Sequence, residues 1–481
     1  MCFYAAESST CLMSGSYRVG FSSTNITPPL DLGIRVGGYL RLHKVSEKVL
    51  DFLYARAVCF RHPDDPAQSL IIISADLVGF QYRIARLARR AISRRTGVPV
   101  SRIILHFTHS HSSPDTIGIF PNRLANLLTF DVQYDVIRYI MRHMIRAGVN
   151  AFNDARDAKI GYGTTAPPEP FLAIRRRPPY EPITLPVRFL KITDADGKLA
   201  GIVVNYQAHP TQLPGKNADV HPEYPGMVAK ALYNQYPNLK LAAYFNGAAG
   251  DVTIHGYKGY YSARYYHHAT HADAMANALK EVEDLGKRFA DLVVDAIDAV
   301  PVEPVTSIDV RRRFVFPRIG RVKSVWGRLR HYHSLKDRAR ILLRELRDIL
   351  RIGLFHNFYK FLNGRFLPML NIITNGRRTY HQTELFVARI NDIYWFSSPG
   401  EPFITYQENI FKHVPSDKHI FSQMNETCGY IYPWNFYVQG GYEKLFSFDA
   451  LFGRYMYDLF KDTLKKMKDE PHEKNESGLS P

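Results

Sequence analysis

The stretch RIILHFTHSHSSPD, Arg102 to Asp115, runs from a strand pattern straight into a loop rich in histidine and serine. Residues 102–107 are mostly apolar and β-branched, which is typical of a buried strand. Side chains two residues apart in an extended chain point the same way, so we expect His109 and His111 to face one site. Imidazole is a common zinc ligand, and the segment predicts a metal centre, although histidines in a polar loop also occur without a metal.

Strands followed by polar loops recur on both sides of this stretch. Apolar runs predict strands at 57–60, 70–77, 187–192, 201–206 and 239–245, and strand-like sequence at 384–396. Helical spacing predicts helices at 81–95, 224–233 and 272–300. Loops bearing histidine and glycine follow the strand ends, where open α/β sheets place ligands. We therefore expect an α/β fold with a mixed β-sheet core flanked by helices.

The domain organisation follows from composition along the chain. At 481 residues, length alone would allow two or three domains, but no interior linker rich in Pro, Gly or Ser is present. We expect one large catalytic domain over 17–465, carrying a basic helical insertion at about 320–372. Residues 466–481 are almost devoid of apolar side chains, which predicts a disordered tail.

Positive charge is concentrated in one segment of a chain whose net charge is +17. Residues 311–378 hold 18 Lys and Arg against three acidic residues, a net charge of +15. Three interpretations stay open: an anionic membrane surface binds here, an anionic substrate enters here, or the segment is an ordinary solvated helix packed on the core. Nucleic acid is not expected, because no nucleic-acid-binding module accompanies the charge.

The expected location is cytoplasmic, with peripheral attachment to a membrane as an open alternative. The sequence begins without the basic start and apolar run of a secretory signal, and no stretch reaches the ~18–20 apolar residues of a membrane span. Its four cysteines have spacings that fit neither a zinc knuckle nor a disulfide framework.

Short motifs in a fixed order carry a family resemblance. They are FSSTNITPPL (21–30), LDFLYARAVCF (50–60), SADLVG (74–79), HFTHSHSSPD (106–115), NYQAHPTQ (205–212), FNGAAGDVT (245–253), PGEPF (399–403) and GYIYPWNFYVQGGYE (429–443). In this order the sequence resembles the catalytic domain of the neutral, non-lysosomal ceramidase family, from Val19 to about Tyr442.

The resemblance implies a zinc-dependent hydrolase in which a metal-activated water attacks an amide carbonyl. It implies the zinc ligands His109, His209, Glu401 and Tyr430, with Tyr432 as the alternative tyrosine. It implies catalytic roles for His111, Asp251, Thr253 and Arg176, of which His111 would transfer a proton or stabilise the developing oxyanion. Taken singly, each of these residues also has an ordinary structural interpretation. A second ion, Ca²⁺ or Mg²⁺, stays open.

The sequence also departs from the family pattern. Thr253 stands where the family has a serine, Arg175 stands where an asparagine is expected, and the sequence ends soon after the GYE motif, without the family's C-terminal β-sandwich domain. We therefore expect the substrate to be an N-acyl lipid or glycoconjugate, with ceramide itself undecided. The alternative is a catalytically impaired, metal-containing binding protein that docks on anionic membrane surfaces.

Overall fold

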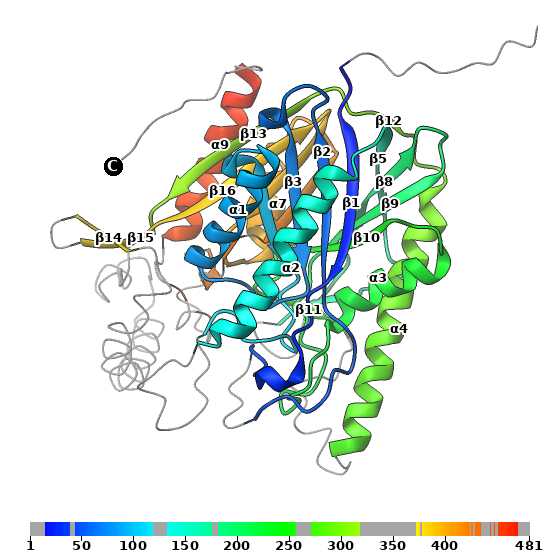
Figure 1. Ribbon diagram of the computed structural model, residues 1–481, viewed down its shortest axis with the longest axis vertical. Helices are drawn as coiled ribbons and strands as arrows, with labels where there is room; N and C mark the ends of the chain where they lie inside the picture. Colours follow the sequence, from blue (N-terminus) through cyan, green and yellow to red (C-terminus); the bar gives the residue numbers. More distant parts are fainter. Residues whose placement is uncertain are drawn as a thin grey trace, which may run out of the picture.

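The computed structural model, shown in Figure 1, describes most of the expected domain. The described residues are 15–38, 44–118, 132–175, 181–255, 271–317, 372–375, 378–423, 425–426, 429–433, 443, 447 and 451–469. The expected basic insertion therefore lies outside the described residues except at Ile372, and so do Arg176 and the tail beyond Asp469.

The first sheet has the strand order β1-β2-β3-β4, with β3 and β4 parallel and the other pairs antiparallel. Its strands are β1 (Arg18–Asn25), β2 (Tyr54–Arg61), β3 (Leu70–Ala75) and β4 (Ile103–Phe107). Helices α1 (Tyr82–Thr96) and α2 (Tyr134–Asn153) lie side by side over one face of this sheet (Figure 1). The inner side of α1 buries small and aliphatic residues, and Gly97 ends the helix in a left-handed conformation.

The second sheet packs on the other face of the first and has the order β10-β9-β8-β5-β12. Its strands are β5 (Ala158–Thr165), β8 (Val187–Asp194), β9 (Leu199–Tyr206), β10 (Leu241–Asn246) and β12 (Glu303–Pro304). Strands β8 and β9 form the expected hairpin, whereas β9 and β10 are parallel. Helices α3 (Glu223–Gln235) and α4 (His271–Ile297) cover its outer side. Helix pair, sheet, sheet and helix pair thus form four layers.

A third mixed sheet, of order β13-β16-β17-β19, packs beside these layers and carries helices α7 and α9. The bounds are β13 (Ile308–Val315), β16 (Thr383–Ile390), β17 (Ile393–Ser398), β19 (His419–Gln423), α7 (Ile404–Phe411) and α9 (Phe452–Asp469). Helix α9 corrects the expected start of the tail at residue 466, because it continues to Asp469. The buried side chains of Leu464 and Met467 hold this last turn against the core.

Shorter elements complete the architecture. The strands are β6 (Leu172–Ile174), β7 (Glu181–Ile183), β11 (Val252–Ile254), β14 (Ile372–Asn375), β15 (Arg378–His381), β18 (Glu401–Pro402) and β20 (Tyr430–Ile431). Three 3-10 turns lie at Leu30–Leu32, Pro66–Gln68 and Val100–Arg102. No helix among the described residues is both long and apolar enough to cross a membrane.

Buried polar side chains connect the sheets to one another. Ser74 of β3 donates a hydrogen bond from Oγ to the carbonyl oxygen of Tyr244 in β10, at 2.6 Å. His106 of β4 accepts one at Nε2 from the backbone N–H of Asn246, at 2.9 Å. Asn205 of β9 donates to carbonyl oxygens of both β10 and β19. A buried polar group without a partner is costly, so these bonds fix how the sheets align.

The expected fold class is confirmed: mixed sheets are flanked by helices in one compact α/β fold. Within the described residues, the predicted strands and helices are present with boundaries shifted by a few residues. Elements that the sequence pattern did not predict include β1, β5, β13, α2 and α9.

Acid should weaken this fold through His106, whose pKa burial lowers to about 3. In the unfolded chain the histidine pKa returns to about 6.5, so below that pH the unfolded state binds a proton that the folded state excludes. Stability is therefore full above pH 6.5 and falls as the pH drops towards 3, by about 2 kcal/mol at pH 5 from this residue alone.

Urea unfolding of His106→Gln at pH 7 and pH 5 measures this contribution. The loss of unfolding free energy between the two pH values should be about 2 kcal/mol smaller than in the parent. The matched control is His143→Gln on the partly exposed side of α2. Equal pH dependence in His106→Gln and the parent would contradict the assignment.

Candidate metal centre

The three sheets bring together loops that are far apart in the sequence. Each sheet contains one parallel pair, β3 with β4, β9 with β10, and β17 with β19. His109 follows the end of β4, His209 follows β9 and Glu401 follows β17. Loops at the carboxyl ends of parallel strands are where α/β sheets place ligands, and here three such ends meet.

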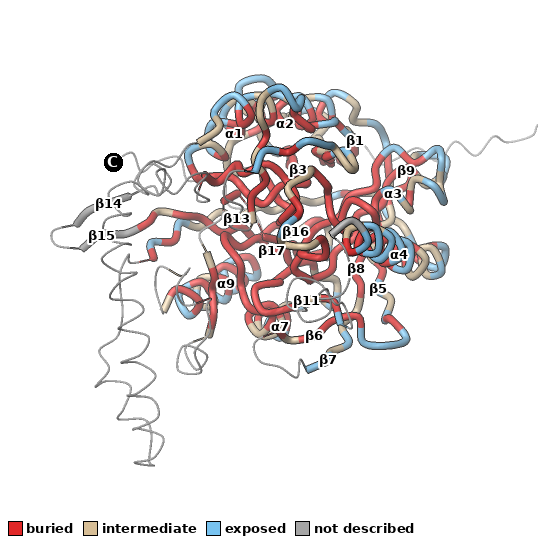
Figure 2. Tube along the Cα trace, turned by 90° about the horizontal axis from the view of Figure 1, so that it is seen from below, coloured by how far each residue is buried: buried red, intermediate tan, exposed pale blue. Residues whose placement is uncertain are grey.

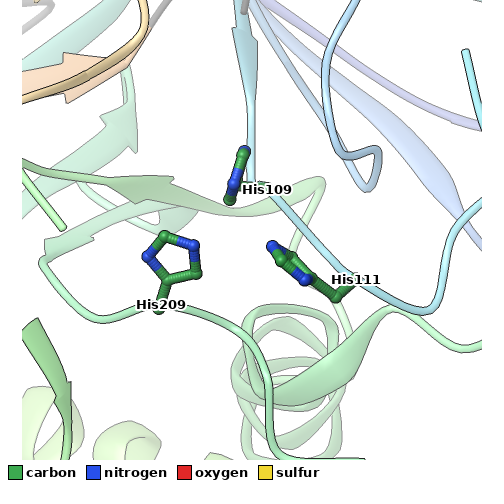
Figure 3. Close-up of side chains that lie close together, drawn as sticks. All are labelled: His109, His111 and His209. Carbon is green, nitrogen blue, oxygen red and sulfur yellow. The ribbon is translucent and has the colours of Figure 1, made fainter. Parts of the chain in front are cut away.

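Figure 3 shows the three histidines His109, His111 and His209 facing one another. All three are buried, and their ring centroids lie 4.8 to 5.2 Å apart. One nitrogen from each ring lies within 4.8 Å of the others, so the group could hold a metal ion. The structure thus gathers the three histidines that the sequence analysis singled out.

The geometric reason expected for the pairing of His109 and His111 is wrong. The chain is not extended at His109, which has a φ of 68°, in the left-handed region. Residues other than glycine rarely adopt this conformation, and it costs roughly 1–2 kcal/mol. A turn of the backbone after β4, and not the alternation of an extended strand, directs both rings into the site.

Backbone carbonyl groups fix the tautomers of two of the rings. Nδ1 of His109 lies 2.8 Å from the carbonyl oxygen of Val78, and Nδ1 of His209 lies 2.9 Å from that of Ala249. A carbonyl oxygen only accepts, so each Nδ1 carries a proton and each Nε2 of a neutral ring presents a lone pair. Nη2 of Arg175 also lies 3.2 Å from Nδ1 of His209, a longer contact than the 2.9 Å to the Ala249 carbonyl oxygen. Burial, followed by the charge of Arg175, lowers the pKa of His209 well below its usual value and keeps the ring neutral.

Both Nε2 lone pairs point at the carboxylate of Glu401. Oε2 of Glu401 lies 3.5 Å from Nε2 of His109 and 3.4 Å from Nε2 of His209. Burial raises the pKa of the Glu401 carboxyl, whereas His109 in its protonated form, Arg175 and the hydrogen bond from Tyr430 lower it, and its pKa lies below the usual value. With both rings neutral, two lone pairs and a carboxylate oxygen at these distances repel one another, so either a proton or a metal cation must lie between them. The residues therefore fit a metal ion, since carbonyl-anchored histidines are the usual arrangement around one.

Tyr430 and Arg175 border this group. Strand β20 pairs with β18, which sets Tyr430 opposite Glu401, and the Tyr430 hydroxyl hydrogen-bonds to the Glu401 carboxylate. Arg175 donates from Nη2 to the Tyr430 hydroxyl at 3.1 Å and to the Gly250 carbonyl oxygen at 2.9 Å. The alternative tyrosine, Tyr432, packs with Phe403 at a ring distance of 6.0 Å.

Arg175 is the arginine that the described residues place at this site. Arg176 lies outside the described residues, whereas Arg175, which the motif alignment had placed at an asparagine position, is buried at the site. Strand β6 ends at Ile174, so the next side chain turns inward. The sequence has three consecutive arginines at 175–177 and gives no sign of which one faces the site.

Asp251 and Thr253 lie in the loop and strand beside the site. Oδ1 of Asp251 accepts the backbone N–H of Ile404 at 2.8 Å, at the start of α7, and its carbonyl oxygen accepts that of Arg175. Asp251 thus holds α7 and Arg175 in place. Thr253 is partly buried in β11, opposite Ala173 of β6.

Glu223 ties the two histidine loops together, and the sequence analysis did not identify it. It is fully buried, and Oε1 accepts the hydroxyl of Ser112 at 2.6 Å. Oε2 accepts the backbone N–H groups of Gln212 and Leu213, both at 3.0 Å. Ser112 follows His111, and Gln212 follows His209 by three residues. A single acid in HPEYP gives no sign of this role in the sequence.

Replacing Glu223 by Ala should weaken metal binding at the histidines. Two backbone N–H groups and one hydroxyl would lose their buried acceptor, and the loops would lose their fixed separation. By analogy with other residues that orient metal ligands, affinity for Zn²⁺ should fall roughly 10- to 100-fold.

Competition with a chromogenic chelator measures this affinity. Glu223→Gln retains one acceptor oxygen and should fall between the parent and Glu223→Ala. The matched control is Glu283→Ala on the exposed side of α4. Parent-like affinity for Zn²⁺ in a folded Glu223→Ala variant would show that the hydrogen bonds of Glu223 do not position the metal ligands.

Comparison with solved structures finds proteins of similar fold. No family model matches the sequence, and no curated protein matches it. A solved structure described as a ceramidase complexed with C2 superposes with a TM-score of 0.69 at 16% identity, covering 97% of this chain and 77% of that chain. Neutral ceramidase from Pseudomonas aeruginosa gives a TM-score of 0.68 at 16% identity, covering 98% and 77%. The chain therefore has the fold of the neutral ceramidases.

Proposed function

We propose that the chain is a zinc-dependent hydrolase that cleaves an N-acyl amide bond of a lipid or glycoconjugate. One observation carries the proposal: the unprotonated Nε2 atoms of His109 and His209 both face the buried carboxylate of Glu401, at 3.5 and 3.4 Å. The similarity in fold to the ceramidases supports the substrate class.

We assign His109, His209, Glu401 and Tyr430 as the zinc ligands. Two imidazoles with a carboxylate are a frequent donor set for catalytic zinc, and the tyrosine oxygen completes four donors. When bound, zinc supplies a water of lowered pKa and polarises the carbonyl oxygen of the substrate. A second ion, Ca²⁺ or Mg²⁺, is left outside the proposal.

His111 and Arg175 are the groups that we expect to act on the substrate. His111 lies beside both ligand rings, with centroids 5.1 and 5.2 Å away, and would take the proton of the nucleophile and pass it to the leaving amine. The buried guanidinium of Arg175 would stabilise negative charge on the carbonyl oxygen, worth roughly 3–4 kcal/mol for such donors. Asp251 positions Arg175, and Thr253 borders the same loop.

The proposal includes a cytoplasmic location with attachment to a membrane surface, where lipid substrates reside.

The competing function is a metal-containing binding protein that has lost catalysis through Thr253. It predicts bound zinc without turnover of any N-acyl substrate. A gain of ceramide hydrolysis in Thr253→Ser would favour an active hydrolase whose substrate preference depends on Thr253 over a binding protein without catalysis.

Zinc removal is the first test of the proposal. The purified chain should contain about one zinc ion by atomic emission, and a chelator should abolish hydrolysis of a fluorogenic N-acyl amide until Zn²⁺ is restored. His209→Ala should lose the metal and at least about 100-fold of the activity, because it removes a direct ligand. His143→Ala on α2 is the matched control. Absence of stoichiometric zinc from the parent would overturn the proposal.

Gly38 offers a separate test of His111. A Cβ on Gly38 would lie 2.4 Å from Cγ of His111, whereas one on Gly33 would have no neighbour within 4 Å. Both glycines have positive φ, 85° and 63°, so Gly38→Ala and Gly33→Ala carry similar backbone strain. Only the first should displace the His111 ring.

Gly38→Ala should retain zinc and lose roughly 10²- to 10⁴-fold in kcat, the usual contribution of a proton-transfer group. Gly33→Ala should keep both zinc and activity. Loss of zinc from Gly38→Ala alone would instead make His111 a metal ligand and contradict the role assigned to it.

A further inference from the structure

The outward face of the helix pair α1 and α2 is strongly basic. Its exposed basic residues are Arg83, Arg86, Arg90, Arg94 and Arg95 of α1 and Arg138, Arg142 and Arg146 of α2. We call this set the arginine face. Both helices cover the same side of the first sheet (Figure 1), and exposed stretches of both lie on the outer surface (Figure 2).

Almost no negative charge accompanies the arginine face. The one acidic residue in the two helices is Asp135, which pairs with Arg138 at 3.3 Å. Within the described part of the chain, no carboxylate forms an ion pair with the other seven. By contrast, Arg89, on the inner side of α1, is buried against Glu384.

Arginines of the expected basic segment behave differently where the structure describes them. Arg311 pairs with Asp309 at 3.0 Å, Arg313 pairs with Asp462 at 2.6 Å, and Arg312 pairs with Glu384. Each of these three arginines of β13 has a carboxylate partner. Among the described helices, the largest group of basic side chains that form no ion pair within the described residues therefore lies on α1 and α2.

The opposite outer layer has the opposite charge. Helix α4 carries Lys280, Lys287 and Arg288 against six acidic residues, a net charge of −3. The arginine face, with eight arginines and Asp135, has a net charge of +7. A molecule polarised in this way orients itself in an electric field, with α1 and α2 towards a negative surface.

We propose that the arginine face docks the protein on an anionic lipid bilayer. Guanidinium groups bind phosphate oxygens with paired hydrogen bonds, which suits phospholipid headgroups. Leu87, 51% exposed between Arg86 and Arg90, offers an apolar side chain to the interface. The two helices are roughly 22 and 30 Å long and form one broad layer, whereas recognition of DNA grooves uses a protruding helix.

The two helices of the arginine face begin near the candidate metal centre. Helix α1 starts beside Gln81, which donates to the carbonyl oxygen of Ile117 in the loop after His111. Helix α2 starts beside Gln133, which bonds to the segment that runs past the same loop, through Gly33 and Arg35. Both helices therefore begin at the site end of the molecule. The proposal does not depend on hydrolysis, since no member of the arginine face contacts the histidines.

Vesicle co-sedimentation of the full chain tests the proposal. Vesicles of phosphatidylcholine with about one third phosphatidylserine should bind the parent, pure phosphatidylcholine vesicles should not, and salt should release the protein. Arg86→Gln with Arg142→Gln should lower the partition coefficient about 30-fold, from about 1 kcal/mol per charge. The matched control, Lys280→Gln with Lys287→Gln on α4, removes the same charge and should change it less than twofold.

Three results would overturn the proposal. One is equal binding of neutral and anionic vesicles. Another is a loss of binding in the α4 control as large as that in the α1/α2 variant. A third is parent-like binding in the α1/α2 variant, which would place the docking surface elsewhere, for instance in 318–371. If a mixed-sequence DNA duplex binds the parent more tightly than the vesicles do, and only that binding is lost in the α1/α2 variant, the face serves nucleic acid instead.

Discussion

The candidate site depends on one buried carboxylate, that of Glu223. Its two oxygens accept three donors from the loops that carry His111 and His209, which come from different sheets. Glu223 itself has a φ of 56°, an unusual conformation for a residue other than glycine. Strain at this residue and at His109 persists only because the surrounding bonds over-determine the backbone. Rigid loops favour metal binding, because the ligand atoms are then already held at the distances that the ion requires.

Burial gives the histidines their chemistry as well as their positions. Hydrogen bonds from Nδ1 to Val78 and Ala249 select the tautomer, and burial keeps His209 uncharged. The lone pairs that result cannot be satisfied by the nearby carboxylate, which also only accepts. The donor set of the site therefore fits a cation. Arg175 and the hydrogen bond from Tyr430 favour the ionised form of Glu401 inside the protein.

Sequence reasoning reached those parts of the fold that local patterns determine. Apolar runs and helical spacing predicted β3, β4, α1, the β8–β9 hairpin and α4, because each forms a core face from consecutive residues. His109, His111, His209 and Glu401 were identified through motifs after strand ends, and they do converge. Glu223 and the register of Arg175 were missed, because their roles exist only after distant loops meet. The left-handed backbone at His109 was likewise invisible to an argument from strand alternation.

The sequence of helix α1 predicts an apolar and a basic side of the helix, but Arg89 departs from this pattern. Its spacing separates an apolar side from an arginine side, yet Arg89 lies with the apolar residues and is buried against Glu384. A buried arginine without a carboxylate would cost several kcal/mol, so Glu384, almost 300 positions later, had to be in place. Buried Glu384 pairs with both Arg89 and Arg312, whereas no ion pair within the described residues involves the outer arginines of α1 and α2 other than Arg138. Core stability does not require those outer charges. Their concentration on one face is therefore better explained by a negative partner outside the protein than by folding.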